Sequence, residues 1–251
     1  MFGPRLKVER ANYHIDQFEA LFRAYIKTNL KFVFPKGHNN KRRKHAYRMA
    51  YLGTPAPRHA PTVIGDAIHN LRTSLDHMYC RLVEANKGVV TKRTKFPFGE
   101  DRKSIEGSLN GQKSIERPSQ DAIAFILDSL EPFSGGALSL YELHQLDIVD
   151  KHHLFLDMMI GFGIDDGLVL EQFDAAGVRR MSFSQLTINW GYNPKGGFAA
   201  TDGHFEFNGD ASSAFEVLFG EGAFKGKHII QTMRALSQNV SGALDALEVF
   251  L

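Results

Sequence analysis

Hydrophobic residues in the stretch IGDAIHNLRTSLDHMYCRLV, from Ile64 to Val83, recur in steps of four and three. This spacing predicts an amphipathic helix with one continuous apolar stripe. The stripe consists of Ile64, Ile68, Leu71, Leu75, Met78 and Leu82. The rest of the helix surface carries a polar set: Asp66, His69, Asn70, Arg72, Asp76 and His77. Two imidazoles, two carboxylates and a guanidinium within a dozen residues make this helix the first candidate for a functional site.

Four further helices follow from the same periodicity. The first is expected to end before Pro35 and Gly37, because both residues break helices. In the helix expected over residues 138–159, the spacing places Tyr141, Ile148 and His152 on the apolar side, so we expect His152 to be buried. An adjoining polar strip carries His144, Asp147 and Lys151 at positions i, i+3 and i+7. The expected ranges are 6–34, 119–131, 138–159 and 227–250.

Beyond Gly161 the pattern changes to the alternation of β-strands, separated by Gly, Asn-Pro and Asp-Gly turns. We expect an antiparallel sheet of about four or five strands there. The predicted fold class is therefore α+β: a helical bundle with an inserted antiparallel β-sheet module and a C-terminal helix that packs back on the bundle. The expected parts are residues 1–160, 161–222 and 223–251, forming one compact unit.

With 251 residues, 43% of them hydrophobic, the chain is large enough to bury a sizeable core. It has no apolar run long enough to span a membrane, and the N-terminus MFGPRLKVER lacks the apolar core of a secretory signal. Cys80 is the single cysteine, which excludes an internal disulfide. We therefore expect a soluble, cytoplasmic protein without a membrane partner.

Charge is unevenly distributed along the chain. Residues 1–120 carry 23 basic and 10 acidic residues, a net charge of +13, whereas residues 121–251 carry 7 and 18, a net charge of −11. The asymmetry fits either an anionic partner of the first half or attraction between the halves. A basic run falls within residues 36–48; it is either a solvated loop or a patch that contacts RNA phosphates. Its candidate RNA-binding residues are Lys41, Arg42, Arg43, Lys44 and Arg48.

The two polar helices align without gaps. His69-Asn70-Leu71-Arg72 corresponds to His144-Gln145-Leu146-Asp147, and Asp76-His77 corresponds to Lys151-His152. The charges are inverted in this alignment, so adjacent helices could pair Arg72 or Lys151 with Asp76 or Asp147. Buried charges are tolerated only when they are paired in this way. The likeness fits either a duplicated hairpin or chance.

Arg72-Thr73-Ser74-Leu75-Asp76-His77 is an R-x4-H element with a polar residue after the arginine. Here the chain resembles the HEPN-superfamily ribonucleases, which are helical proteins with an R-x4–6-H signature. The resemblance implies metal-independent endoribonuclease activity in bacterial or phage conflict, no cofactor, and a homodimer. Arg72 and His77 would be catalytic: His77 would move protons, and Arg72 would stabilise the phosphate charge. The supporting residues would be His69, Asn70, Thr73, Asp76, His144, Asp147, Lys151 and His152.

Two alternatives remain open. An i, i+5 pair lies about 140° apart around a regular helix, whereas Arg72 shares a side with His69 and Asp76. The polar residues then form a buried structural network in a non-catalytic protein. The second alternative is a metal site built from the histidines and carboxylates of both helices, although the H-x3-H and E-x-x-H spacings are absent.

A broader likeness covers most of the helical part. The combination of GDAIHNLRTSLDH and LHQLDIVDKHH resembles a signature of uncharacterised bacterial proteins of about this length. That resemblance implies a bacterial or phage origin and carries no function of its own.

Overall fold

The structure is a computed structural model. It describes residues 3–33, 45–51, 57, 59–153, 158–164, 169–173, 176, 179–183, 186–190, 197–200, 204–208 and 215–251. The chain forms two compact units. The first unit comprises Met1–Phe18, Pro61–Leu156 and Ile230–Leu251, and the second comprises Glu19–Ala60 and Asp157–Ile229.

The described part of the chain is mostly helical and contains six α-helices, one more than the five that the sequence predicted. The central one, α2, carries the apolar stripe found in the sequence. All six stripe residues are at most 1% exposed. Because burying one such side chain contributes roughly 1.5–3 kcal/mol, this stripe is a large part of the hydrophobic core of the first unit. The helices are α1 (Gly3–Asn29), α2 (Ala60–Ala85), α3 (Arg102–Asn110), α4 (Gln120–Phe125), α5 (Leu140–His153) and α6 (Ile229–Leu247).

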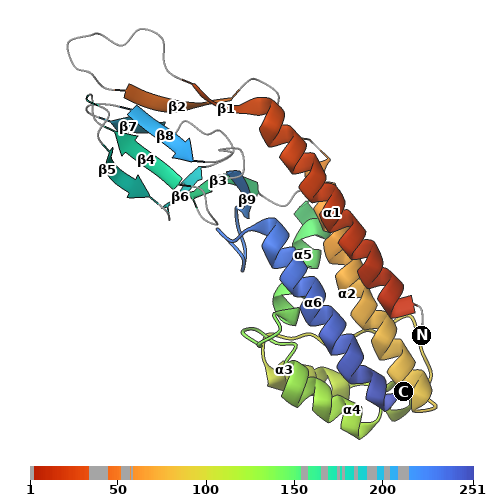
Figure 1. Ribbon diagram of the computed structural model, residues 1–251. Coiled ribbons are helices and arrows are strands. Elements are labelled where there is room, and N and C mark those ends of the chain that lie inside the picture. The colour runs from red at the N-terminus through yellow and green to blue at the C-terminus, as the bar shows by residue number, and fades with distance from the viewer. Residues whose placement is uncertain are drawn as a thin grey trace. The chain divides into compact units, whose positions relative to one another are not determined.

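The C-terminal helix α6 packs against the first turns of α1, as the sequence predicted (Figure 1). Ser237 donates a hydrogen bond to Asn12 at 2.7 Å, and Arg234 pairs with Asp16 at 2.9 Å. The ion pair is exposed and contributes little stability. The apolar face of α6 contributes far more, because its residues are buried: Ile229, Met233, Leu236, Val240, Ala243, Leu244 and Leu247.

The second unit contains nine described strands, all paired antiparallel. They form three three-stranded sheets with the orders β1-β2-β7, β6-β3-β9 and β5-β4-β8. The strands are β1 (Leu30–Val33), β2 (His45–Tyr51), β3 (Met158–Ile164), β4 (Val169–Phe173), β5 (Arg179–Phe183), β6 (Leu186–Trp190), β7 (Gly197–Ala200), β8 (His204–Asn208) and β9 (Phe215–Phe219).

Strands β1 and β2 correct the sequence prediction for residues 30–51. The first helix was expected to continue to residue 34, but α1 ends at Asn29 and Leu30 begins a strand. A short apolar run such as LKFVF fits both periods, so periodicity alone did not place the boundary. Likewise, the helix expected over 138–159 ends at His153, and β3 begins at Met158.

The buried face of α5 also differs from the prediction. Leu140, Leu143 and Leu146 are buried together with Asp147, whereas Tyr141 and Ile148 are only half-buried. Helix α5 has apolar residues on more than one side, and the buried side was missed because it includes a carboxylate. His152 belongs to α5, but its side chain lies outside the described part of the structure.

Among the described residues, no helix combines the length and apolarity needed to cross a bilayer.

Candidate functional site on α2 and α5

Helices α2 and α5 lie antiparallel and in contact in the first unit. Gly65 lies against Asp150, His69 binds Asp147, and Arg72 also pairs with Asp147. Contacts at increasing residue numbers on α2 therefore meet decreasing residue numbers on α5, as in any antiparallel pair of helices. Of the charge pairs expected between the adjacent helices, Arg72 with Asp147 is present, whereas Arg72 with Asp76 and Lys151 with Asp147 are pairs within one helix.

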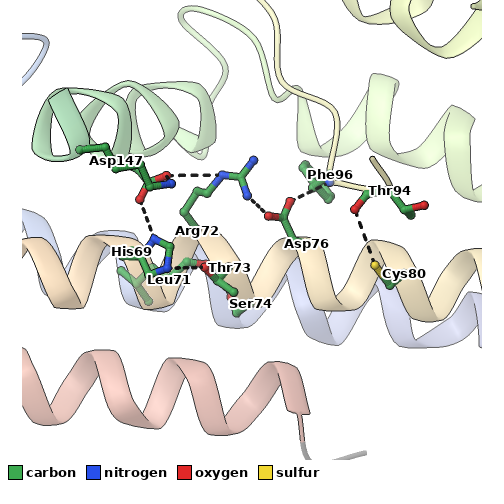
Figure 2. Close-up of polar contacts among 11 residues, drawn as sticks. His69, Leu71, Arg72, Thr73, Ser74, Asp76, Cys80, Thr94, Phe96 and Asp147 are labelled. Carbon is green, nitrogen blue, oxygen red and sulfur yellow. Dashed lines mark hydrogen bonds and ion pairs between the residues drawn. The ribbon is translucent and has the colours of Figure 1, made fainter. Parts of the chain in front are cut away.

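The guanidinium of Arg72 is enclosed between three partners. Its Nη1 forms an ion pair with Asp76, one helical turn further along α2, and its Nε lies 3.8 Å from Asp147 Oδ2. Figure 2 shows the guanidinium between these two carboxylates. The ring of Phe98 covers it, with Cζ 5.3 Å from the ring centroid. Burial lowers the pKa of Arg72, and the charge of Asp147 opposes that shift. With 10% of its side chain exposed, Arg72 has little surface left for a substrate.

His144 also contacts Phe98. The two rings stack with centroids 4.5 Å apart and an interplanar angle of 14°. Burial, and then the positive charge of Arg72, lower the pKa of His144 to about 4. This histidine is therefore neutral at pH 7. Its Nδ1 is buried without a hydrogen-bond partner among the described residues.

Asp147 is the centre of the polar cluster, with only 1% of the residue exposed. It accepts hydrogen bonds from Lys151 Nζ and, at 3.0 Å, from Nδ1 of His69. Burial by itself raises the pKa of Asp147, but the hydrogen bonds from Lys151 and His69 outweigh it and the net shift is downward. The carboxylate therefore stays charged at neutral pH. The pKa of neighbouring Asp150 is raised, first by burial and then by the charges of Asp147 and Asp66.

His69 combines a buried partner with an open face. Its side chain is 48% exposed, whereas that of Asp147 is 2% exposed. While Nδ1 is held by Asp147, Nε2 lies 3.4 Å from Thr73 Oγ1 and remains on the accessible side (Figure 2). A carboxylate on one ring nitrogen fixes the tautomer and the orientation of an imidazole. This arrangement suits a group that accepts and returns protons.

His77 lies on a different side of α2. It is exposed, and a Cβ built on Gly3 of α1 would lie 3.6 Å from its Nδ1. Burial, and then the charge of Lys7, lower the pKa of His77. Asn70 shares this side, since it accepts a hydrogen bond from Lys7 at 3.2 Å. The candidate pair Arg72 and His77 therefore does not come together within one chain. This agrees with their five-residue spacing, which places them on different sides of a regular helix.

Asp76 connects the cluster to the irregular segment that follows α2. Its Oδ2 pairs with Arg72, and its Oδ1 accepts a hydrogen bond from the backbone N–H of Phe96 at 2.9 Å. This bond holds the segment that carries Phe98 over Arg72. Phe98 was missed by the sequence analysis, because no periodic signal marks the Phe-Pro-Phe stretch.

Other predicted residues fall outside this description. Lys41, Arg42, Arg43 and Lys44 are not among the described residues, and only the backbone of Arg48 is described, in β2. Within the described residues, no group of three or more His, Cys, Asp or Glu side chains is placed to share a metal ion.

No protein-family model matches the chain, and no curated protein or solved structure is similar to it at a significant level.

Proposed function

We propose that the protein cleaves RNA without a metal ion, and that His69 has the proton-transfer role that the HEPN resemblance gives to His77. The observation that carries this proposal is the contact between His69 and Asp147, which lie 3.0 Å apart. The imidazole is half-exposed and the carboxylate is buried. The positively charged first half of the chain supports an anionic substrate.

The chemistry follows from the position of Nε2, the ring nitrogen that Asp147 does not bind. The ribose 2′-oxygen attacks the adjacent phosphorus, and its proton passes to Nε2 of His69. The bond between phosphorus and the 5′-oxygen breaks, the 5′-oxygen takes a proton from water, and a cyclic phosphate remains. The hydroxide formed from that water takes the proton from Nε2, which restores the neutral imidazole. Asp147 stabilises the imidazolium that forms. Lys151, whose side chain is 48% exposed, supplies positive charge next to the same carboxylate.

In this scheme Arg72 is a positioning residue. Its contacts with Asp76, Asp147 and Phe98 occupy the guanidinium and hold the carboxylate that orients His69. This assignment departs from the HEPN pattern, in which the arginine contacts the phosphate.

A second candidate function is favoured by the burial of Arg72, which is only 8% exposed. In this alternative the polar cluster is a non-catalytic network that fixes α2 against α5, and the antiparallel strands provide an interaction surface. A buried network of paired charges can specify one arrangement of helices without increasing stability.

The two candidates and the HEPN assignment are separated by one assay. Labelled single-stranded RNA is incubated in EDTA with the wild-type protein and with His69→Ala and His77→Ala variants that keep the wild-type melting temperature. We expect cleavage to a cyclic phosphate that is reduced at least about 100-fold in His69→Ala, the contribution typical of a positioned acid–base group, and retained in His77→Ala. Loss in His77→Ala alone would restore the HEPN assignment. No cleavage by the wild-type protein would favour the structural network.

A further inference from the structure

The first unit contains a second polar feature, a cleft of about 480 Å³ between the turn after α2 and the end of α3. Its walls include Thr91, Lys92, Arg93 and Thr94 on one side and Gly111 and Lys113 on the other. None of these residues belongs to the cluster around Asp147. We propose that this cleft binds a backbone phosphate of the RNA strand whose cleavage is proposed above, and the inference rests on that proposed function.

Charge is the first support for this assignment. Lys92, Arg93 and Lys113 are exposed cleft residues, and Glu116 is the single carboxylate among the lining residues. None of the three cations forms an ion pair within the described part of the chain. By contrast, Arg5, Arg23 and Arg102 all pair with carboxylates. Unpaired cations gathered in one concavity attract phosphate groups.

The cleft is also built from fixed backbone. Thr91 N–H donates to Thr94 Oγ1 at 2.9 Å, and Thr94 N–H donates to the Thr91 carbonyl at 3.1 Å. The sulfhydryl of Cys80 on α2 contacts the Thr94 carbonyl at 3.8 Å (Figure 2). The two walls are joined where Val89 N–H donates to the Ile115 carbonyl at 2.7 Å. A preorganised site of this kind binds with a smaller entropic cost than a mobile loop.

Exposed apolar residues beside the cleft favour a nucleotide over a bare inorganic anion as its ligand. Val89, Val90 and Ile115 are among the exposed large hydrophobic residues, at 49%, 38% and 52% exposure. They lie next to the cleft in the sequence, and Val89 and Ile115 are hydrogen-bonded neighbours. A nucleotide places a flat, largely apolar base beside its charged phosphate, so cations with an apolar border match its chemistry.

The cleft and His69 also lie on compatible sides of α2. Residues 69 and 80 are eleven positions apart, which corresponds to about 20° of rotation and about 16 Å of rise on a regular helix. Cys80, which anchors the cleft turn, therefore shares a face of α2 with His69. Residues 94–98 cover this face between the two positions, so a short RNA strand would pass over that segment to reach both the cleft and the imidazole.

The test separates binding from cleavage. A His69→Ala variant is used so that the RNA stays intact, and its affinity for a fluorescein-labelled single-stranded oligonucleotide is measured by anisotropy at several salt concentrations. We expect the added pair Arg93→Ala and Lys113→Ala to weaken binding by about tenfold or more. We also expect the slope of log K against log salt to decrease by about 1.4, because each of the two phosphate interactions removed contributes about 0.7. The control Lys103→Ala, an exposed lysine of α3 outside the cleft, should change affinity less than about twofold.

Each outcome bears on one of the two proposals. If the Arg93 and Lys113 replacements leave RNA affinity unchanged, or if no RNA is bound, the cleft assignment is wrong. If the cleft replacements abolish binding but the wild-type protein does not cleave the bound RNA, the cleft assignment holds and the catalytic role of His69 is wrong. Since all three replaced residues are exposed, the variants should keep the parent melting temperature, and this is checked before binding is compared.

Discussion

Gly65 of α2 lies directly against the carboxylate of Asp150 on α5, and a Cβ at residue 65 would overlap both carboxylate oxygens. The end of the Asp150 side chain occupies the space that a side chain at residue 65 would need. One turn further along, the same approach brings His69 within 3.0 Å of Asp147. The contact between Gly65 and Asp150 thus lies one turn away from the candidate site.

Replacing Gly65 with alanine should therefore destabilise the protein. The overlap should cost about 1–3 kcal/mol, partly offset by the helix propensity that alanine gains over glycine, at most about 1 kcal/mol. Adding Asp150→Ala should recover most of the loss, because it removes the overlapping atoms. Urea unfolding of the two single variants and the double variant measures the coupling.

A matched control for this comparison is Gly242→Ala on α6, where a Cβ would meet nothing within 4 Å. There we expect alanine to stabilise the protein by roughly 0.5–1 kcal/mol. Equal effects at residues 65 and 242 would contradict the close approach of α2 and α5.

Arg72→Ala should be strongly destabilising. It removes the partner of two carboxylates, one of them in Asp147, which is 1% exposed, and breaking a buried charge pair costs about 3–5 kcal/mol. The control is Arg23→Ala, which breaks the i, i+4 pair with Glu19 while 70% of the arginine side chain is exposed. That change should cost about 0.3–0.5 kcal/mol. Denaturant midpoints that fall equally for both variants would show that Arg72 is not held in a buried network.

Stability should fall between about pH 6.5 and pH 4 because of His144. Its pKa is about 4 in the folded protein and about 6.5 when unfolded, so in this range the unfolded chain binds a proton that the folded chain does not. His144→Phe should lose this part of the pH dependence and keep the ring stacked on Phe98. The comparison is urea unfolding of both proteins at pH 7 and pH 4.5.

Two other groups define the limits of that experiment. The pKa of His77 is also lowered by burial, so it contributes in the same direction in both proteins and cancels in the comparison. The lowered pKa of Asp147 provides stability that is lost only below about pH 4, as the carboxyl takes up a proton. An NMR titration that places the His144 imidazole near pH 6.5 would overturn the description of its buried environment.

The single thiol should react slowly in the folded protein. Burial raises the pKa of Cys80, and the charge of Glu84 raises it further, so little thiolate is present at pH 7. We expect labelling by a thiol reagent at pH 7 to be at least about tenfold slower than in urea. A rate that is unchanged by unfolding would mean that the contact between Cys80 and Thr94 does not shield the sulfur.

The sequence predicted where the helices of the first unit lie better than which of their sides are buried. The stripe of α2 was predicted residue by residue, because a steady step of three and four has one interpretation as a helix. The prediction of the buried side of α5 was wrong, because that side contains Asp147, whose burial depends on Lys151 and His69. Such compensation is a property of the tertiary structure and is invisible to a hydropathy pattern.

The candidate site was predicted in composition but not in geometry. Arg72, His69, Asp147 and Lys151 were all singled out, and their charge pairing was anticipated. The link from His69 to Asp147 was missed, because two helices 78 positions apart can be placed in register only by packing. Packing also decides that Phe98 covers Arg72 and that His77 lies on another side of α2.

The double role of Asp76 has a consequence for how the guanidinium meets water. The same carboxylate pairs with Arg72 and accepts the backbone N–H of Phe96, two residues before Phe98, so it links the guanidinium to the segment that covers it. Each transient detachment of the segment would uncover a cation that is otherwise sealed. The hydrogen-exchange rate of the Phe96 amide then reports how often this segment opens and exposes Arg72 to solvent.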